Sequence, residues 1–142
     1  MKSYARSLMA ALLCAVCAAG CATMKGPTDE EMIQTTLSTV KTALEGKDVK
    51  LLMTTFTKDY ADPRVGDRAA IEKILSENIN SSYTENGKVT MEDMKLTFSD
   101  DKKSVKVYPI DLSSVMGAVS VEIVLAKTEE GWLISGVNPD GV

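Results

Sequence analysis

The sequence predicts an α+β domain in which three helices pack on one face of a mainly four-stranded antiparallel sheet. Apolar residues recur at helical spacing up to residue 79, and after Lys88 the period changes to two. Short polar turns separate the alternating stretches, so we expect the strands to pair as an antiparallel meander. A run of helices followed by a run of strands is typical of the α+β class.

The first two helices have clear beginnings and ends. Thr28 and Glu31 form a capping box at the start of the first helix, and Gly46 ends it. Its apolar stripe consists of Ile33, Leu37, Val40 and Leu44. Asp48 caps the second helix, which we expect to end near Phe56 because several threonines lower the helix propensity there.

An extended stretch and a turn come before the third helix. Pro63 pushes Asp62 out of helical geometry. Asp67 then caps a helix that we expect over residues 68–79. The stripe that this helix is expected to bury consists of Ala70, Ile71, Ile74, Leu75 and Ile79.

Four strands follow, and we expect irregularities in the first two. They are expected over residues 89–98, 105–112, 119–125 and 132–137. In the first, the alternation slips by one residue at Asp93, which suggests a bulge. In the second, Pro109 cannot donate to the ladder and favours an edge or bulged position. Two faces are expected there, with Val105 and Val107 on one and Tyr108, Ile110 and Leu112 on the other.

An apolar run over residues 8–21, LMAALLCAVCAAGC, follows the basic residues Lys2 and Arg6. A basic start, an apolar stretch and a small-residue end are the marks of an export signal. The run is shorter than the roughly 20 apolar residues that span a bilayer. Its ending, Ala-Ala-Gly-Cys, resembles the lipobox of bacterial lipoproteins, although Ala18 stands where that motif usually has Leu. The alternative is an ordinary secretory signal cut near Gly20.

The lipobox resemblance implies three parts for the chain: a signal peptide over residues 1–20, a tether over 21–27 and a domain over 28–142. It implies acyl chains such as palmitate on Cys21 and a lipid-anchored place in the cell envelope. Ala22 rather than Asp follows the cysteine. In a Gram-negative host, this implies the outer membrane, facing the periplasm.

Composition excludes several kinds of chemistry. Loss of Lys2 and Arg6 with the signal takes the Lys and Arg count from 16 to 14 against 20 Asp and Glu, which gives a net charge of −6. An acidic domain without a basic cluster is not expected to bind nucleic acid. The chain has no histidine, and no cysteine follows Cys21. Ser-His and Cys-His nucleophiles are therefore excluded, and we expect no disulfide, metal or cofactor.

Two stretches resemble nuclear-transport-factor-2-like domains, a group that includes SnoaL-like proteins. Residues 60–63 and 66–71, YADP and GDRAAI, resemble the start of their third helix, and residues 131–136, GWLISG, resemble their last strand. The order of elements agrees over about 29–137. The resemblance implies a cone, in which a strongly curved sheet wraps around the helices and encloses a pocket. It also implies that two copies can pair through the sheet.

Two classes of function stay open. In the first, which we favour, the cone binds a small apolar ligand or a protein partner at the membrane surface without catalysis. Phe56 and Tyr60 would then line the pocket, and Trp132 either plugs the core or forms a pocket wall. Methionines such as Met91, Met94 and Met116 are adaptable enough to line such a cavity, but filling of gaps in the core is the favoured interpretation.

The second class is a SnoaL-like isomerase or hydratase with Asp62 as the general base, near Tyr60, Arg64 and Asp67. It is the weaker hypothesis, because an aspartate before a proline is a common turn former and no second catalytic group stands beside it. A buried Asp62 that faces a cavity with Tyr60 or Tyr108 would favour the enzyme. An exposed Asp62 in a turn would favour the binding protein.

Overall fold

The computed structural model describes residues 25–139, so the signal peptide, Cys21 and the start of the tether lie outside the described residues. The helices are α1 (Asp29–Glu45), α2 (Val49–Met53), α3 (Arg68–Asn78) and the 3-10 turn η1 (Ser82–Thr84). The strands are β1 (Ala61–Asp62), β2 (Gly66–Asp67), β3 (Lys88–Thr90), β4 (Lys95–Phe98), β5 (Ser104–Ser114), β6 (Gly117–Thr128) and β7 (Gly131–Pro139). Within 25–139, no helix is both long and apolar enough to cross a membrane.

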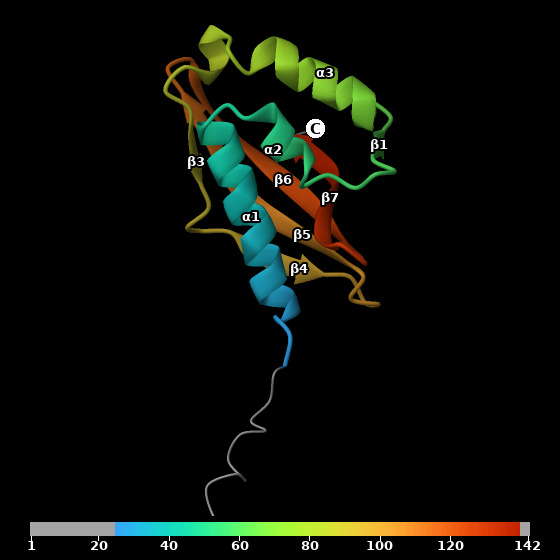
Figure 1. Ribbon diagram of the computed structural model, residues 1–142. Coiled ribbons are helices and arrows are strands. Elements are labelled where there is room, and N and C mark those ends of the chain that lie inside the picture. Colours follow the sequence, from blue (N-terminus) through green and yellow to red (C-terminus); the bar gives the residue numbers. More distant parts are fainter. Residues whose placement is uncertain (1–24, 140–142) are drawn as a thin grey trace, which may run out of the picture.

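The α+β class is confirmed: the helices lie over one face of an antiparallel sheet (Figure 1). Five strands rather than four form this sheet, in the order β3-β5-β6-β7, with β4 also pairing with β5. The bulge expected at Asp93 is instead a turn, in which the Met94 N–H donates to the Met91 carbonyl at 3.4 Å. The expected first strand is therefore two strands, which pair with opposite ends of β5.

Of the two positions that Pro109 favours, edge or bulged, the bulged one is confirmed; β5 is not an edge strand, because it lies between β6 and the pair β3 and β4. The expected irregularity is present, since the register with β6 shifts between Val107 and Ile110. This shift turns Ile110 to the core side together with Val107, so the prediction that they occupy opposite faces is wrong. Leu112 packs against the same core, whereas Tyr108 is 39% exposed.

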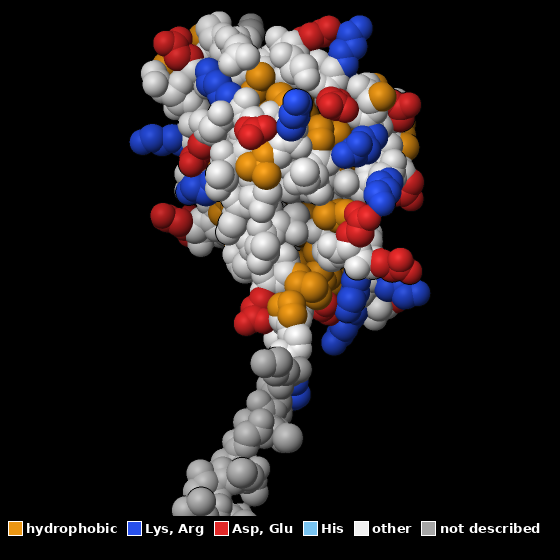
Figure 2. All heavy atoms as spheres, viewed as in Figure 1, with side chains coloured by type: hydrophobic (Ala, Val, Ile, Leu, Met, Phe, Trp, Pro, Cys, Tyr) orange, Lys and Arg blue, Asp and Glu red, His pale blue; other side chains and the backbone are white. Residues whose placement is uncertain are grey.

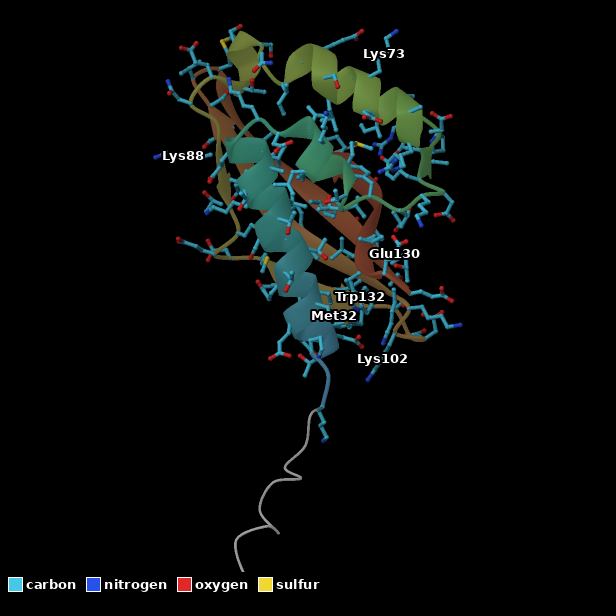
Figure 3. All side chains as sticks on the ribbon, in the orientation of Figure 1. Met32, Lys73, Lys88, Lys102, Glu130 and Trp132 are labelled. Carbon is cyan, nitrogen blue, oxygen red and sulfur yellow. The ribbon has the colours of Figure 1, made fainter. Side chains whose placement is uncertain are left out.

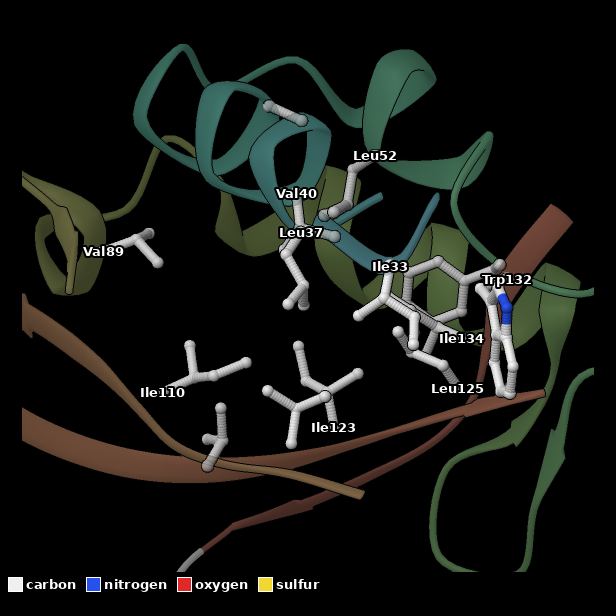
Figure 4. Close-up of a cluster of buried hydrophobic side chains, with 14 of the residues drawn as sticks. Ile33, Leu37, Val40, Leu52, Val89, Ile110, Ile123, Leu125, Trp132 and Ile134 are labelled. Atoms are coloured by element: carbon white, nitrogen blue, oxygen red, sulfur yellow. The ribbon is translucent and has the colours of Figure 1, made fainter. Parts of the chain in front are cut away.

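The core lies between α1 and the concave face of the sheet (Figure 4). Leu37, Val40 and the other apolar residues of α1 face inward-pointing side chains such as Ile110 and Ile123. Trp132 is fully buried and meets Phe98 edge-on, with ring centroids 5.9 Å apart. Burial of such large apolar side chains is the main source of stability in a domain without disulfides.

Polar contacts also fix α1 on β7. The Thr36 hydroxyl donates to the Trp132 carbonyl at 2.6 Å, and the Trp132 indole N–H donates to Asp29 Oδ1 at 3.1 Å. The predicted caps Thr28, Asp48 and Asp67 are confirmed, since each side chain accepts a backbone N–H of its own helix. The Thr28 cap therefore fixes where α1 begins, and the hydrogen bonds with Trp132 fix which side of α1 lies against β7.

The second helix is shorter than expected and ends at Met53. The hydroxyl of Thr54 donates to the Leu51 carbonyl, which favours a turn over a further helical residue. Beyond the turn, the Thr57 N–H donates to the Ile134 carbonyl at 2.9 Å. This segment covers the outer edge of β7.

The third helix has no buried residue, so the expected burial of its stripe is wrong. Ile74 is 42% exposed, and only Ile79, just after the helix, is buried. The reason is its position: α3 packs mainly against α2 and β2, at one end of the molecule (Figure 1). The Arg68 guanidinium fastens it there through a 2.7 Å hydrogen bond to the Met53 carbonyl.

Candidate ligand-binding site

A groove of about 400 Å³ opens at the end of the molecule where α1 stops. Its walls come from the end of α1, the segment after α3, β3, and the hairpin that joins β5 to β6. Six of the lining residues are large and apolar: Leu44, Ile79, Val89, Leu112, Met116 and Val119. This volume lies within the range of small-molecule pockets, which are mostly apolar.

The groove lies where the β5–β6 hairpin extends beyond the end of α1 (Figure 1). Val119 continues the alternation of the buried residues Val121 and Ile123, and it pairs directly with Leu112 on β5. This part of the face lies beyond the end of α1 (Figure 1), and Val119 is 47% exposed. Val115 and Met116 at the hairpin tip are 57% and 61% exposed. Such a cluster of exposed apolar side chains marks a site of interaction.

The groove offers few polar groups. Lys88 is the one charged residue among its lining residues, and its side chain points away from the fold (Figure 3). The Thr84 hydroxyl already lies 2.6 Å from the Ile79 carbonyl, and the Ser114 hydroxyl accepts the Met116 N–H at 3.2 Å. Within residues 25–139, no acidic cluster suited to a metal ion is present. The groove is therefore suited to bind apolar molecules, and the lining residues that the structure describes offer no acid–base pair.

Asp62, the candidate general base, is buried at the end of β1, next to the exposed turn of the β1–β2 hairpin. Its Oδ1 accepts the Arg64 backbone N–H at 2.7 Å and the Arg64 Nε–H at 3.2 Å, and its Oδ2 accepts Nη2–H at 3.0 Å. Arg64 Nη2 also donates to the Val137 carbonyl at 2.9 Å and to Asn138 Oδ1 at 3.0 Å. The pair therefore links the β1–β2 hairpin to the end of β7.

This geometry does not suit a general base. The hydrogen bonds from Arg64 hold the pKa of the Asp62 carboxyl below its ordinary value of 3.8. A base must have a free lone pair and a pKa near the working pH. Burial, and then the nearby Asp62 charge, raise the pKa of Tyr60, so this hydroxyl stays protonated. Asp62 is thus buried, as the enzyme hypothesis required, but it faces Arg64 rather than the groove.

The other predicted site residues lie in the core. Phe56 and Tyr60 meet edge-on with ring centroids 5.0 Å apart and are 6% and 3% exposed. Trp132 lies beside Asp29 at the start of α1, whereas the groove lies beside Leu44 near its end. None of the three lines the groove. The signal that could have located the groove is the apolar pair Val115-Met116 in a turn, where polar residues are usual.

The face of the molecule in Figure 2 mixes Lys and Arg side chains with Asp and Glu side chains, without a continuous area of positive charge.

Neither a family model nor a curated protein sequence matches the chain. Solved structures do match it. A cystatin-like-fold protein from Nostoc punctiforme aligns with a TM-score of 0.62 and 10% identity, over 78% of this chain and 88% of that one.

Two further structures align over a similar share of the chain. An NTF-2 like protein from Shewanella oneidensis aligns with a TM-score of 0.60 and 12% identity, over 79% of this chain and 98% of its own. AusH from Aspergillus nidulans aligns with a TM-score of 0.62 and 16% identity, over 82% and 88% of the two chains. The chain therefore has the NTF2-like, cystatin-like fold. At these identities the likeness shows the fold alone, and function has to be argued from the site.

Proposed function

We propose that this chain is an exported, lipid-anchored, non-catalytic domain that binds a small, uncharged apolar molecule in the groove beside the β5–β6 hairpin. The observation that carries the proposal is the groove itself: six large apolar side chains, two of them exposed, with no carboxylate among the lining residues. Removing apolar surface from water would drive binding. The few hydroxyl groups at the rim would orient the ligand rather than hold it.

The geometry suits a domain attached to a membrane at Cys21. The tether would join α1 at Asp29, and the groove lies beside Leu44 at the other end of that helix. A helix of 17 residues is about 25 Å long. The groove would therefore open away from the anchoring membrane and take its ligand from the aqueous compartment.

Anchoring is tested by labelling cells with a radioactive fatty acid. The wild-type protein should carry the label, and the Cys21→Ala variant should not, because the proposed attachment point is gone. Equal labelling of the variant would exclude lipidation at Cys21.

Ligand binding is tested with the fluorescent, uncharged dye N-phenylnaphthylamine. The exported protein with Cys21→Ala is used, so that no acyl chain competes for the dye. Val119→Glu places a charge on the groove wall, and we expect it to weaken dye binding about tenfold or more. Ile74→Glu is the matched control, because Ile74 is similarly exposed, at 42% against 47%, but does not line the groove. Equal dye affinity of the two variants would contradict the proposal.

Pairing of two copies through the outer face of the sheet is a separate part of the proposal. That face is polar: Asn138 Nδ2 donates to Glu122 Oε1 at 3.0 Å, and Lys106 Nζ lies 3.8 Å from the same oxygen. A pair held by such groups would be weak and sensitive to salt. Sedimentation at low and high salt tests it, and a monomer under both conditions would exclude it.

A further inference from the structure

Met116 stands apart from the other methionines of the described chain. It is 61% exposed, whereas Met53 is buried in the core and Met32, Met91 and Met94 are partly buried against it. Met116 is also the one methionine that lines the apolar groove. The same thioether is therefore open to solvent and part of a site that depends on apolar contacts.

The turn that carries Met116 keeps this side chain at the mouth of the groove. The Met116 N–H donates to the Ser114 hydroxyl at 3.2 Å, and Gly117 follows with a φ of +135°, which favours glycine. A Cβ added at Gly117 would meet no atom within 4 Å, so the turn is open to solvent. A small oxidant can reach the sulfur without any opening of the fold.

We propose that Met116 is a reversible oxidation site that lowers the affinity of the groove for its apolar ligand; this inference rests on the proposed function. The oxidant is a hydroperoxide. The thioether sulfur attacks one peroxide oxygen, the O–O bond breaks, and the sulfur, oxidised by two electrons, becomes a sulfoxide. With hydrogen peroxide, the other oxygen leaves as water. A methionine sulfoxide reductase with a thiol reductant reverses the step.

The sulfoxide would weaken binding because most of the groove wall is apolar and cannot satisfy the new oxygen. Val119 and Leu112, on the neighbouring wall, offer no hydrogen-bond donor. The Thr84 hydroxyl already donates within its own turn, and Lys88 points away from the fold (Figure 3). A bound apolar ligand would cover the polar oxygen and remove its water, which costs free energy. Oxidation would thus release the ligand without unfolding the domain.

The test combines limited peroxide treatment of the exported protein carrying Cys21→Ala, peptide mass spectrometry and N-phenylnaphthylamine titration. Among the methionines of residues 25–139, we expect the first added oxygen at Met116. Dye affinity should be about tenfold lower after full oxidation and should be restored by the reductase. Met116→Leu keeps the shape without the oxidisable sulfur, so its affinity should withstand peroxide. Met94→Leu is the matched control and should lose affinity as the wild type does.

Three results would overturn the inference: first oxidation at Met32, Met91 or Met94, unchanged dye affinity after Met116 is oxidised, or an equal loss in Met116→Leu. The two proposals can fail separately. If the untreated protein binds no dye, the proposed function fails and the inference fails with it. If dye binding survives oxidation of Met116, only the inference fails.

Discussion

At the scale of single residues, Asp62 shows how a local pattern can point to two roles. Its sequence neighbours indicated either a turn or a catalytic base. The structure shows that Arg64, two residues along, folds back and occupies both carboxylate oxygens. Arg64 also reaches Val137 and Asn138, more than 70 residues away in the sequence. The sequence could indicate the turn, but not this contact with β7, because it depends on how the whole sheet closes.

Asp62→Asn separates the two roles, because it keeps the shape of the side chain and removes its charge. We expect dye binding to be unchanged and the thermal midpoint to fall, since Arg64 loses its charged partner while remaining near β7. Differential scanning fluorimetry with the dye titration measures both. An enzymatic activity that is present in the wild type and lost in Asp62→Asn, at an unchanged thermal midpoint, would contradict the non-catalytic account.

At the scale of elements, α1 and α3 have similar apolar stripes and different surroundings. The stripe of α1 is buried because the concave face of the sheet lies beneath it. The stripe of α3 was predicted by the same rule, but α3 lies beside α2 and β2 and buries no residue. Periodicity shows which face of a helix is apolar, and it does not show what covers that face. The caps were predictable because they depend only on neighbours in the sequence.

This difference predicts unequal costs for the same substitution. Leu37 on α1 is 1% exposed, so Leu37→Ala should lower the free energy of unfolding by about 2–5 kcal/mol. Leu75 on α3 is only partly buried, so Leu75→Ala should lower the free energy of unfolding by roughly 1 kcal/mol. Urea unfolding measures both values. Equal costs would show that α3 packs as firmly as α1.

The sheet shows a similar limit to prediction. The alternation of residues located β6 and β7, but it did not indicate the shift of register between them, after which Val137 rather than Gly136 packs against the core. The slip in alternation at Asp93 indicated an irregularity, but it could not distinguish a bulge from a turn between two strands, because that depends on how β3 and β4 pair with β5. The groove was missed for the same reason. Its walls come from four segments that meet only in the folded chain.

At the scale of the whole molecule, stability depends on a core without disulfides and on a few well-placed carboxylates. Asp29 accepts hydrogen bonds from Lys127 and Trp132, Asp62 from Arg64, and Asp101 from the Ser99 hydroxyl and the Lys103 N–H. These bonds lower the pKa of all three groups from the ordinary value of 3.8. The folded form therefore binds protons less readily than the unfolded chain.

The sign of the pH dependence follows from these lowered pKa values. The contribution of the three carboxylates to stability is complete above pH 3.8 and is lost as the pH falls below it, through the folded-state pKa values. Thermal unfolding between pH 7 and pH 3 should show a falling midpoint at the acid end, with a smaller fall in Asp62→Asn. A midpoint that rises on acidification would contradict these assignments.

If the groove beside the β5–β6 hairpin is the binding site, a bound ligand must change the surroundings of its walls. Nuclear magnetic resonance can locate the bound dye. The backbone amide signals of the exported protein with Cys21→Ala are followed during titration with N-phenylnaphthylamine. We expect the largest shifts on Ile79, Val89, Leu112 and Val119, while the signal of Tyr60 stays in place. Shifts that centre on Tyr60 and Asp62 instead, with the hairpin unchanged, would contradict this expectation.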